Sequence, residues 1–182
     1  MKRLLVALAI LCLAGCGPWV KTEGPYSADP LNVAVDLPQG WMRQNTGKHI
    51  LMTKDGVLLQ VILIKRMDLT QEKQFQYTKK RVTGEMLPQE VAEVILDDFQ
   101  SDTDNRNLQV EENVPATIGG NQGFKVRFSH GTELGLHYRK LCYGFLKDGW
   151  LYELLYSAPR RHYFDRDMDD FEKVVRSFRL VK

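Results

Sequence analysis

The chain has 182 residues, of which 43% are hydrophobic and 26% are charged, with 25 Lys and Arg against 23 Asp and Glu. Lys2 and Arg3 lie in an N-terminal segment typical of an export signal, and the rest of the chain has equal numbers of basic and acidic residues. This composition suits one domain with a hydrophobic core. It is not typical of a disordered protein or of a strongly cationic nucleic-acid-binding protein.

The first fifteen residues have the pattern of an export signal. Met1–Arg3 is positively charged, and Leu4–Leu13 is an uninterrupted apolar run. A helix over this run would rise about 15 Å, half of a hydrocarbon core of about 30 Å. The run therefore predicts a signal peptide and not a membrane-spanning helix.

The next motif resembles the lipobox of bacterial lipoproteins. It reads Leu13-Ala14-Gly15-Cys16. The resemblance implies a diacylglyceryl group on the Cys16 thiol and signal cleavage between Gly15 and Cys16. Acyl chains there would hold the protein on a membrane without a spanning helix. The alternative is an ordinary secretory signal in which Cys16 is incidental.

Localisation follows from the same resemblance. Gly17 occupies the position where lipoproteins retained in the inner membrane often carry Asp. We therefore expect a palmitate-bearing protein of the cell envelope, on the periplasmic side of an outer membrane. A surface lipoprotein of a Gram-positive cell would carry the same motif.

Composition predicts three segments: a signal peptide over 1–15, the lipidated Cys16 with a flexible tether over 16–30, and one domain over 31–182. The tether is rich in Pro and Gly, and it would reach about 45 Å when extended. Trp19 could instead lie in the lipid interface. Cys142 is the one cysteine expected in the domain, so no intramolecular disulfide is predicted.

The first half of the domain is predicted to be mainly strands. Residues 31–37 alternate between apolar and polar side chains, and an Asp55-Gly56 turn separates residues 49–53 from an apolar run over 57–64. Apolar residues on both faces of 57–64 indicate a central strand covered on both sides. A polar, poorly periodic segment follows over 66–87.

The second half is predicted to contain two helices around a strand meander. Pro88 opens a helix to Phe99 whose acidic face is more typical of solvent exposure than of a binding site. Strands are expected over 110–118, 123–129, 136–146 and 150–157. Ala158-Pro159 is expected to start the final helix, whose apolar stripe predicts core packing, and residues 178–181 are expected to return to the sheet as an edge strand.

These elements predict an α+β fold, with an antiparallel sheet of about six or seven strands covered by helices. Their order and turn positions resemble PsbP-like domains, including DcrB-like bacterial envelope proteins. The resemblance rests on these features in order: Leu37-Pro38-Gln39-Gly40-Trp41, the Asp55-Gly56 turn, Gly120, Gly123 and Phe124 before a strand, the Lys147-Asp148-Gly149 turn, Ala158-Pro159, and the closing helix with Phe171, Ser177 and Phe178. It implies an α/β/α sandwich and an accessory or binding role, and it transfers no functional residues.

The sequence contains no nucleotide-binding, hydrolase or metalloprotease motif. Cys142 is the only candidate nucleophile, and it would need a base such as His130, because His137 lies on the opposite face of a regular strand. A buried, inert Cys142 is the preferred interpretation. Neither the unpaired histidines (His49, His130, His137 and His162) nor the polar loop over 101–107 predicts a metal site, and no cofactor is expected.

Two surfaces remain as candidates. The clusters Arg160-Arg161-His162 and Lys79-Lys80-Arg81 could contact anionic lipid headgroups, or they could be solvated basic patches without a partner. Several aromatic residues could line a groove, although strands of this type normally use them for packing: Tyr138, Tyr143, Trp150, Tyr152 and Tyr156.

The sequence thus favours a lipid-anchored envelope protein that acts as a non-enzymatic binding or assembly accessory. Its expected partners are the membrane, through acyl chains on Cys16, and an envelope protein, but not a nucleic acid. Two alternatives stay open. One is a carrier of a lipid or hydrophobic ligand, which requires an apolar cavity, and the other is a hydrolase or transferase that uses Cys142.

Overall fold

The computed structural model describes residues 19–181. Gly15 and Cys16, on which the lipobox prediction rests, lie outside the described residues. Among residues 19–181, no helix is long and apolar enough to cross a membrane.

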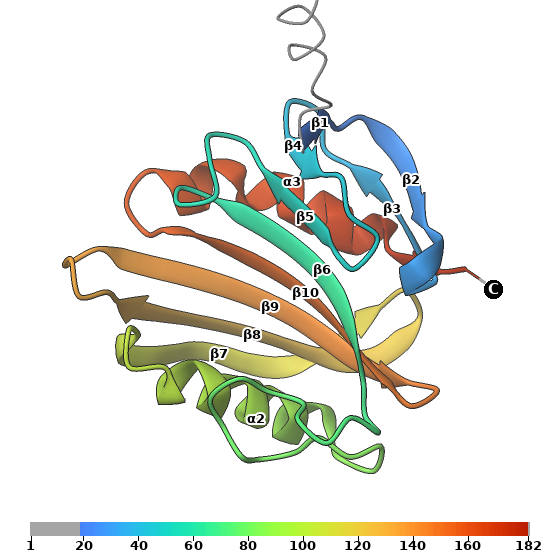
Figure 1. The fold of residues 1–182 in the computed structure, drawn as a ribbon. Coiled ribbons are helices and arrows are strands. Elements are labelled where there is room, and N and C mark those ends of the chain that lie inside the picture. Colours follow the sequence, from blue (N-terminus) through green and yellow to red (C-terminus); the bar gives the residue numbers. More distant parts are fainter. Residues whose placement is uncertain (1–18, 182) are drawn as a thin grey trace, which may run out of the picture.

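The domain consists of a large antiparallel sheet with a helix on each face (Figure 1). The sheet has eight strands in the order β1-β4-β5-β6-β10-β9-β8-β7. Their bounds are β1 Trp19–Lys21, β4 Met42–Gln44, β5 Ile50–Thr53, β6 Val61–Asp68, β7 Arg106–Ile118, β8 Asn121–Gly131, β9 His137–Lys147 and β10 Trp150–Pro159. The α+β sandwich predicted from the sequence is confirmed, with one strand more in this sheet than the upper expected number.

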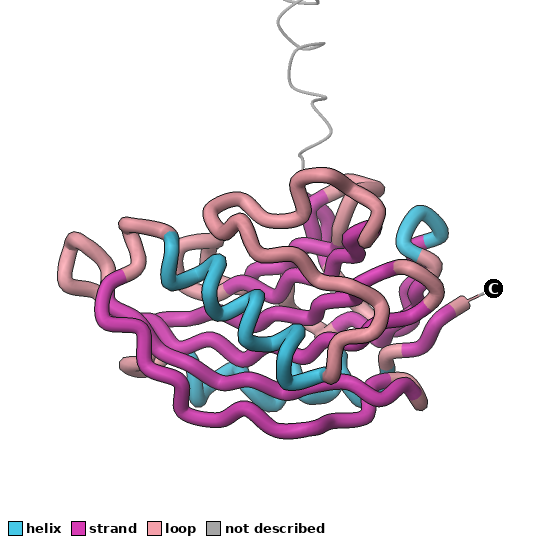
Figure 2. Tube along the Cα trace, turned by 90° about the horizontal axis from the view of Figure 1, so that it is seen from below, coloured by secondary structure: helices cyan, strands magenta, loops and turns pink. Residues whose placement is uncertain are grey.

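Helix α2, Pro88–Ser101, covers one face of the sheet beside the long loop over 69–87 (Figure 2). Val91 and Ile95 are buried against strands β7, β8 and β9. Pro88 occupies the first turn of the helix, where its missing N–H costs no hydrogen bond. The Glu90 carboxylate accepts a hydrogen bond from the Leu87 N–H at 2.7 Å, which caps the same end.

Helix α3, Tyr163–Ser177, and a small sheet cover the opposite face. The small sheet contains β2 Gly24–Ala28, β3 Val33–Leu37 and β11 Arg179–Leu180, in the order β11-β3-β2, and a short 3-10 helix, Asp29–Leu31, joins β2 to β3. Phe164, Phe171 and Val175 lie on the buried stripe of α3, as the sequence predicts. Residues 178–181 therefore return to this small sheet and not to the large one.

The expected tether differs from the structure over 19–30. Trp19–Lys21 pairs with β4, and Gly24–Ala28 pairs with β3, so this segment belongs to the domain. The polar composition misleads because both strands lie at sheet edges with much of their surface exposed. Only Gly17 and Pro18 remain between Cys16 and the first strand.

Two other element boundaries differ from the sequence prediction. Val57 and Leu58 are 48% and 78% exposed in a loop over 54–60, and the strand begins at Val61. Ala158 and Pro159 are the last residues of β10, where they pair with Arg139 and Tyr138. Helix α3 begins only after His162, whose positive φ of 76° reverses the chain.

Candidate functional site

Cys142 lies in the sheet and does not form a nucleophilic site. Its side chain is fully buried within the core under α2, and burial raises the pKa of its thiol well above the ordinary value. It pairs with Val126, whereas His130 pairs with Tyr138 at the end of the same strands. Four strand positions correspond to about 13 Å, so His130 does not serve Cys142 as a base. The burial of Cys142 expected from the sequence is confirmed, and its lack of reactivity stays a prediction.

Two lysines lie near Cys142 on this face. The Lys65 Nζ is 3.1 Å from the carboxylate of Glu153, which is nearly buried. Burial lowers the pKa of Lys140 to about 8, and its Nζ lies 4.7 Å above the centre of the Phe99 ring. Lys65 thus forms an ion pair and Lys140 a cation–π contact beneath α2. The raised pKa keeps the Cys142 thiol protonated at neutral pH.

The basic triplet over 79–81 is partly used within its own loop. Lys80 pairs with Asp97 of α2 at 2.7 Å. The Arg81 guanidinium donates to the carbonyl oxygens of Gln71 and Glu72. These bonds fold the 69–87 loop against α2, which leaves Lys79 as the member of the triplet without such a structural contact among the described residues.

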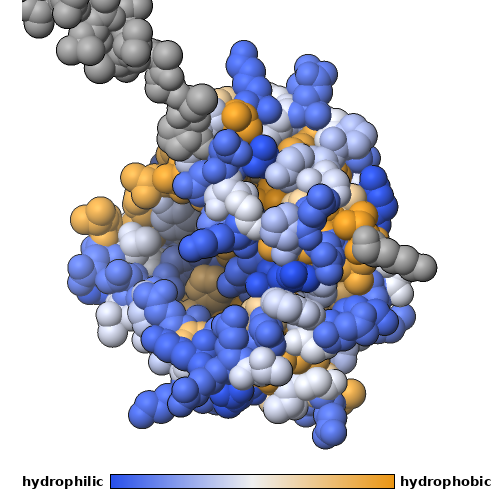
Figure 3. Space-filling view, turned by 45° about the vertical axis from the view of Figure 1, so that its right-hand side comes forward, coloured by the Kyte–Doolittle hydropathy of each residue, from blue (hydrophilic) through white to orange (hydrophobic). Residues whose placement is uncertain are grey.

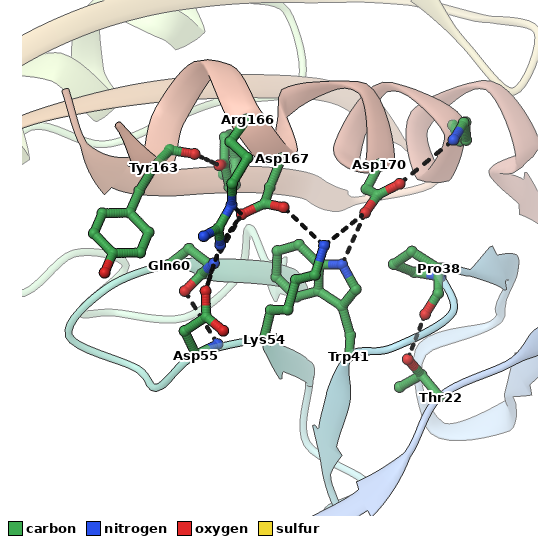
Figure 4. A network of polar contacts seen from close by, with 12 residues as sticks. Thr22, Pro38, Trp41, Lys54, Asp55, Gln60, Tyr163, Arg166, Asp167 and Asp170 are labelled. Carbon is green, nitrogen blue, oxygen red and sulfur yellow. Dashed lines mark hydrogen bonds and ion pairs between the residues drawn. The ribbon is translucent and has the colours of Figure 1, made fainter. Parts of the chain in front are cut away.

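At one end of the large sheet, a polar network joins α3 to the loop between β5 and β6 (Figure 4). Asp167 is 1% exposed on α3, although the stripe around it is apolar. Its carboxylate accepts hydrogen bonds from Lys54 at 2.9 Å, from Gln60 at 2.8 Å and from Arg166 at 2.6 Å. Burial alone would raise the pKa of Asp167, but these donors hold it below the ordinary value.

The same network fixes the shape of the loop. The Thr53 hydroxyl donates to the Gln60 carbonyl oxygen at 2.7 Å, and the Gln60 amide donates to the Asp55 carboxylate at 3.1 Å. Asp55 also pairs with Arg166. Gly56 has a φ of 119°, which favours glycine, and its carbonyl oxygen accepts from the N–H of Leu59 and of Gln60. The tip with Val57 and Leu58 is thus exposed but held in place.

Two further turns lie at this end, as Figure 1 shows. The β8–β9 turn presents Leu134 and Leu136, which are 88% and 49% exposed. The Tyr138 hydroxyl, at the start of β9, donates to the Leu58 carbonyl oxygen at 2.7 Å and so ties this strand to the 54–60 loop. The β10–α3 turn contributes Arg160, whose N–H donates to the His137 carbonyl oxygen at 2.8 Å. We call residues 54–60, 132–138 and 159–162 the loop end.

Two open clefts meet at the loop end and share His137 and Arg160. One is about 670 Å³ and is lined by Gly135, Leu136, His137, Pro159, Arg160 and Arg161. The other is about 350 Å³ and is lined by Asn107, Gln109, Ser129, His130, Gly131, His137 and Arg160. Neither lining contains Asp or Glu, whereas both contain Arg and His.

Acidic residues of the loop end and of its supports are paired. Asp55 pairs with Arg166, Glu133 with Arg106 at 2.5 Å, and Asp165 lies 3.9 Å from Arg139. Within residues 19–181, no carboxylate lies within ion-pair distance of Arg160 or Arg161, the two exposed arginines of the β10–α3 turn: every ion pair involves other cations. The loop end carries Lys54, Arg160 and Arg161 against Asp55 and Glu133, so it has a net positive charge, and two of its three cations have no ion-pair partner among residues 19–181.

His130 is the buried polar residue beside the smaller cleft. It is 5% exposed, its Nδ1 lies 3.2 Å from the Gly131 carbonyl oxygen, and its Nε2 has no hydrogen-bond partner. Its ring stacks on Tyr138 with the ring centres 5.8 Å apart. Burial lowers the pKa of His130 below the ordinary value, because the charged form would lose its solvation.

The described residues offer no cluster of three or more His, Cys, Asp or Glu side chains that could hold a metal ion. His130 and His137 line the same cleft, and neither His49 nor His162 is among its lining residues. In the loop over 101–107, Asp102 accepts the N–H of Asp104 at 3.1 Å and forms a turn after α2. The loop end offers charged groups, hydrogen-bonding groups and apolar side chains.

The sequence predicts only part of this site. Arg160, Arg161 and His162 are recognisable as a basic cluster, and Tyr138 and His130 are candidates for other roles. The exposed tips at Val57 and Leu58 are not predicted, because their apolar run resembles a buried strand. Asp167 is not predicted either, and the available signal for it is an acid among the apolar residues of the last helix.

Comparisons with known proteins bear on the fold. The sequence matches no protein-family model and no curated protein. Among solved structures, it is similar to cyanobacterial PsbP (CyanoP) from Synechocystis, with a TM-score of 0.61 and 13% identity over 92% of this chain and 96% of that one. It is also similar to the Ran-binding protein Mog1p of Saccharomyces cerevisiae, with a TM-score of 0.57 and 8% identity over 90% and 97% of the two chains.

A third similar structure is LpqN of Mycobacterium tuberculosis, a protein involved in cell envelope biogenesis. Here the TM-score is 0.52, the identity is 13%, and the match covers 82% of this chain and 83% of that one. These structural similarities establish the fold, and the low sequence identities leave the function open. The resemblance seen in the order of the sequence elements is confirmed at that level: residues 19–181 form a domain with the PsbP-like fold.

Proposed function

We propose that the chain is a lipid-anchored protein of the cell envelope that binds a partner protein or a small envelope component without catalysing a reaction. The observation that carries the binding role is the loop end. Its apolar tips at Leu58 and Leu134 are exposed, and the Asp167 network fixes the first of them in place. A prearranged apolar contact surrounded by polar side chains is typical of a binding surface.

The anchor part of the proposal rests on the lipobox at Gly15 and Cys16, and the periplasmic side of the outer membrane is the proposed location because Gly17 follows. The LpqN comparison supports an envelope setting for this fold. The lack of a catalytic role is proposed because Cys142 is buried and because the Asp167 carboxylate is fully engaged with its donors.

Site-specific photocrosslinking in intact envelopes tests the binding role. A photoreactive residue in place of Leu58 or Leu134 should yield a discrete adduct, either with a protein or with an envelope lipid. The matched control is the same residue in place of Asp148, at the β9–β10 turn on the opposite end of the sheet. Adducts no stronger at positions 58 and 134 than at position 148 would refute the loop end as the contact surface.

A second candidate function is the transport of a hydrophobic ligand. A cleft between the start of α2 and strands β8 and β9 is lined by Met86, Pro88, Val91, Phe124, Phe145 and Leu146, among others. Its volume is about 250 Å³. Pockets that bury drug-sized ligands usually have roughly 300–1,000 Å³, so this cleft suits only a small apolar group.

A further inference from the structure

We propose that the loop end docks on the surface of a bilayer that contains anionic phospholipids and so provides a second membrane contact beside the acyl chains on Cys16. This inference rests on the proposed lipid anchor and names the partner of the proposed contact surface. It is argued from three observations: the charge of the loop end, its exposed apolar tips and the short link to Cys16.

The charge of the loop end matches an anionic headgroup. Arg160 and Arg161 are exposed, no carboxylate of the described residues lies within ion-pair distance of either, and they line a cleft of about 670 Å³ without acids. By contrast, two arginines of strands β8 and β9 are paired: Arg139 and Arg127 lie 3.0 and 3.3 Å from Glu111. Cations without a partner in the protein gain the most free energy from an anionic membrane surface.

The same cleft combines charge with apolar surface. Leu136 and Pro159 line it beside the two arginines, and Leu134, in the same β8–β9 turn as Leu136, is 88% exposed. Leu58, 78% exposed, is tied to this region through its carbonyl oxygen and Tyr138. A phospholipid surface presents phosphate above hydrocarbon, and leucines at loop tips among cations suit that layering. Figure 3 shows a largely hydrophilic face of the domain on which hydrophobic side chains are exposed in separate groups.

The link to Cys16 is short and leaves from the β1 edge of the sheet. Trp19 begins β1, so the link from Cys16 spans about 10 Å at full extension. Lys21 pairs with Met42, and Met42 pairs with Thr53, the last residue before the 54–60 loop. Trp19 therefore lies only about 7 Å back along the sheet from the level of the loop end. An anchored Cys16 therefore holds the β1 edge of the sheet close to the bilayer, at nearly the same level along the strands as the loop end.

The test uses the mature, lipidated chain reconstituted into vesicles. Leu134→Cys is labelled with an environment-sensitive thiol dye. The dye reacts only at position 134, because Cys142 is buried and the Cys16 thiol carries the acyl group. Vesicles contain a lipid-borne quencher and either phosphatidylcholine alone or an equal mixture with phosphatidylglycerol. Quenching at position 134 should be at least about fivefold stronger in the anionic vesicles. The same dye on Asp148→Cys, at the opposite end, should respond equally to both.

Two charge variants separate this surface from general attraction. Arg160→Glu with Arg161→Glu should abolish the difference between the two vesicle types. Lys73→Glu with Lys79→Glu makes the same change of charge at exposed positions of the 69–87 loop and should preserve the difference. Equal quenching at position 134 in both vesicles, or an equal loss in both double variants, would overturn the docking proposal.

Flotation of the vesicles distinguishes the two proposals. Protein that does not float with neutral vesicles lacks the anchor, and then the proposed function fails. Protein that floats but whose label at position 134 ignores phosphatidylglycerol keeps its anchor and overturns only the docking. A photocrosslink from position 134 to a protein, with no dependence on lipid charge, would assign the loop end to a protein partner instead.

Discussion

The Gln60 amide donates a hydrogen bond of 2.8 Å to the Asp167 carboxylate, across 107 positions of the chain. Both residues are 1% exposed. Asp167 also accepts from Lys54 and Arg166, so one carboxylate on α3 holds the base of the 54–60 loop. The bond shows how a buried polar residue can order a surface loop, because an unpaired carboxylate at this depth would be costly.

Replacing that carboxylate should destabilise the domain. Asp167→Asn removes the negative charge that faces Lys54 and Arg166, and we expect a loss of about 2 kcal/mol in the free energy of unfolding, less than for a fully buried pair because both cations are partly exposed. Urea unfolding measures it. Asp169→Asn, the same change on the exposed side of α3, is the control and should cost less than about 0.5 kcal/mol. Equal losses would contradict the role of Asp167.

His130 should make stability depend on pH. Its folded pKa lies below the unfolded value of 6.5, so its neutral form favours folding, and this contribution is lost as the pH falls below 6.5 through the folded pKa. Besides burial, Lys140 lowers the pKa, while Gly131 and Asp102 raise it. His130→Phe should therefore flatten the fall in melting temperature between pH 7.5 and about 5. An unchanged slope in the variant would rule out His130 as its source.

Gly123 marks the closest backbone approach in the sheet. A Cβ on Gly123 would lie 2.1 Å from the Gly144 carbonyl oxygen and 2.8 Å from the Phe145 Cβ. Gly123→Ala should cost about 3 kcal/mol or more, since neither strand can move without disturbing the core. Gly84→Ala is the matched control, because no atom lies within 4 Å of the added methyl group. Thermal unfolding of both variants checks the contrast, and similar melting temperatures would contradict it.

The Cys142 thiol should be unreactive in the folded protein. It is fully buried and its pKa is raised, so alkylation requires unfolding. Labelling with iodoacetamide should be about 1,000-fold slower under native conditions than in guanidinium chloride. Mass spectrometry of the modified peptide gives both rates. Rapid native labelling would reopen the question of a nucleophilic role.

The anchor prediction concerns Cys16. Cys16→Ser should leave an unprocessed precursor and abolish metabolic labelling with palmitate, because acylation requires the thiol. Cys12→Ser, within the apolar run of the signal, should be processed and labelled normally. Normal labelling of Cys16→Ser would refute the lipobox assignment.

The sequence predicts most of the large sheet because its strands alternate with clear turns. Lys147-Asp148-Gly149 joins β9 to β10 as expected, and Asp148 and Gly149 have φ values of 49° and 79°. The helices were also predictable, since α2 and α3 carry apolar stripes at helical spacing. These turns and helices depend on residues close together in the chain, so the hydrophobic periodicity of a short segment is enough to predict them.

The remaining features depend on contacts between distant segments. Trp19–Lys21 becomes a strand only because β4 offers an edge, and Val57–Leu59 leaves the strand because Gln60 is fixed by Asp167. The loop end likewise combines three turns from separate parts of the chain. No window of the sequence contains both partners, so the candidate site could not be assembled from sequence alone.

The three-residue strand β1 is the outermost strand of the large sheet, and its pairing with β4 is short. Short edge strands open easily compared with the centre of a sheet. With Cys16 as the lipid anchor, each opening of Trp19–Lys21 would lengthen the linker between the lipid and the domain by about 10 Å. Pairing of this edge strand would then set the distance between the domain and the bilayer. With β1 paired the domain lies close to the membrane, and with β1 released it moves away while still attached.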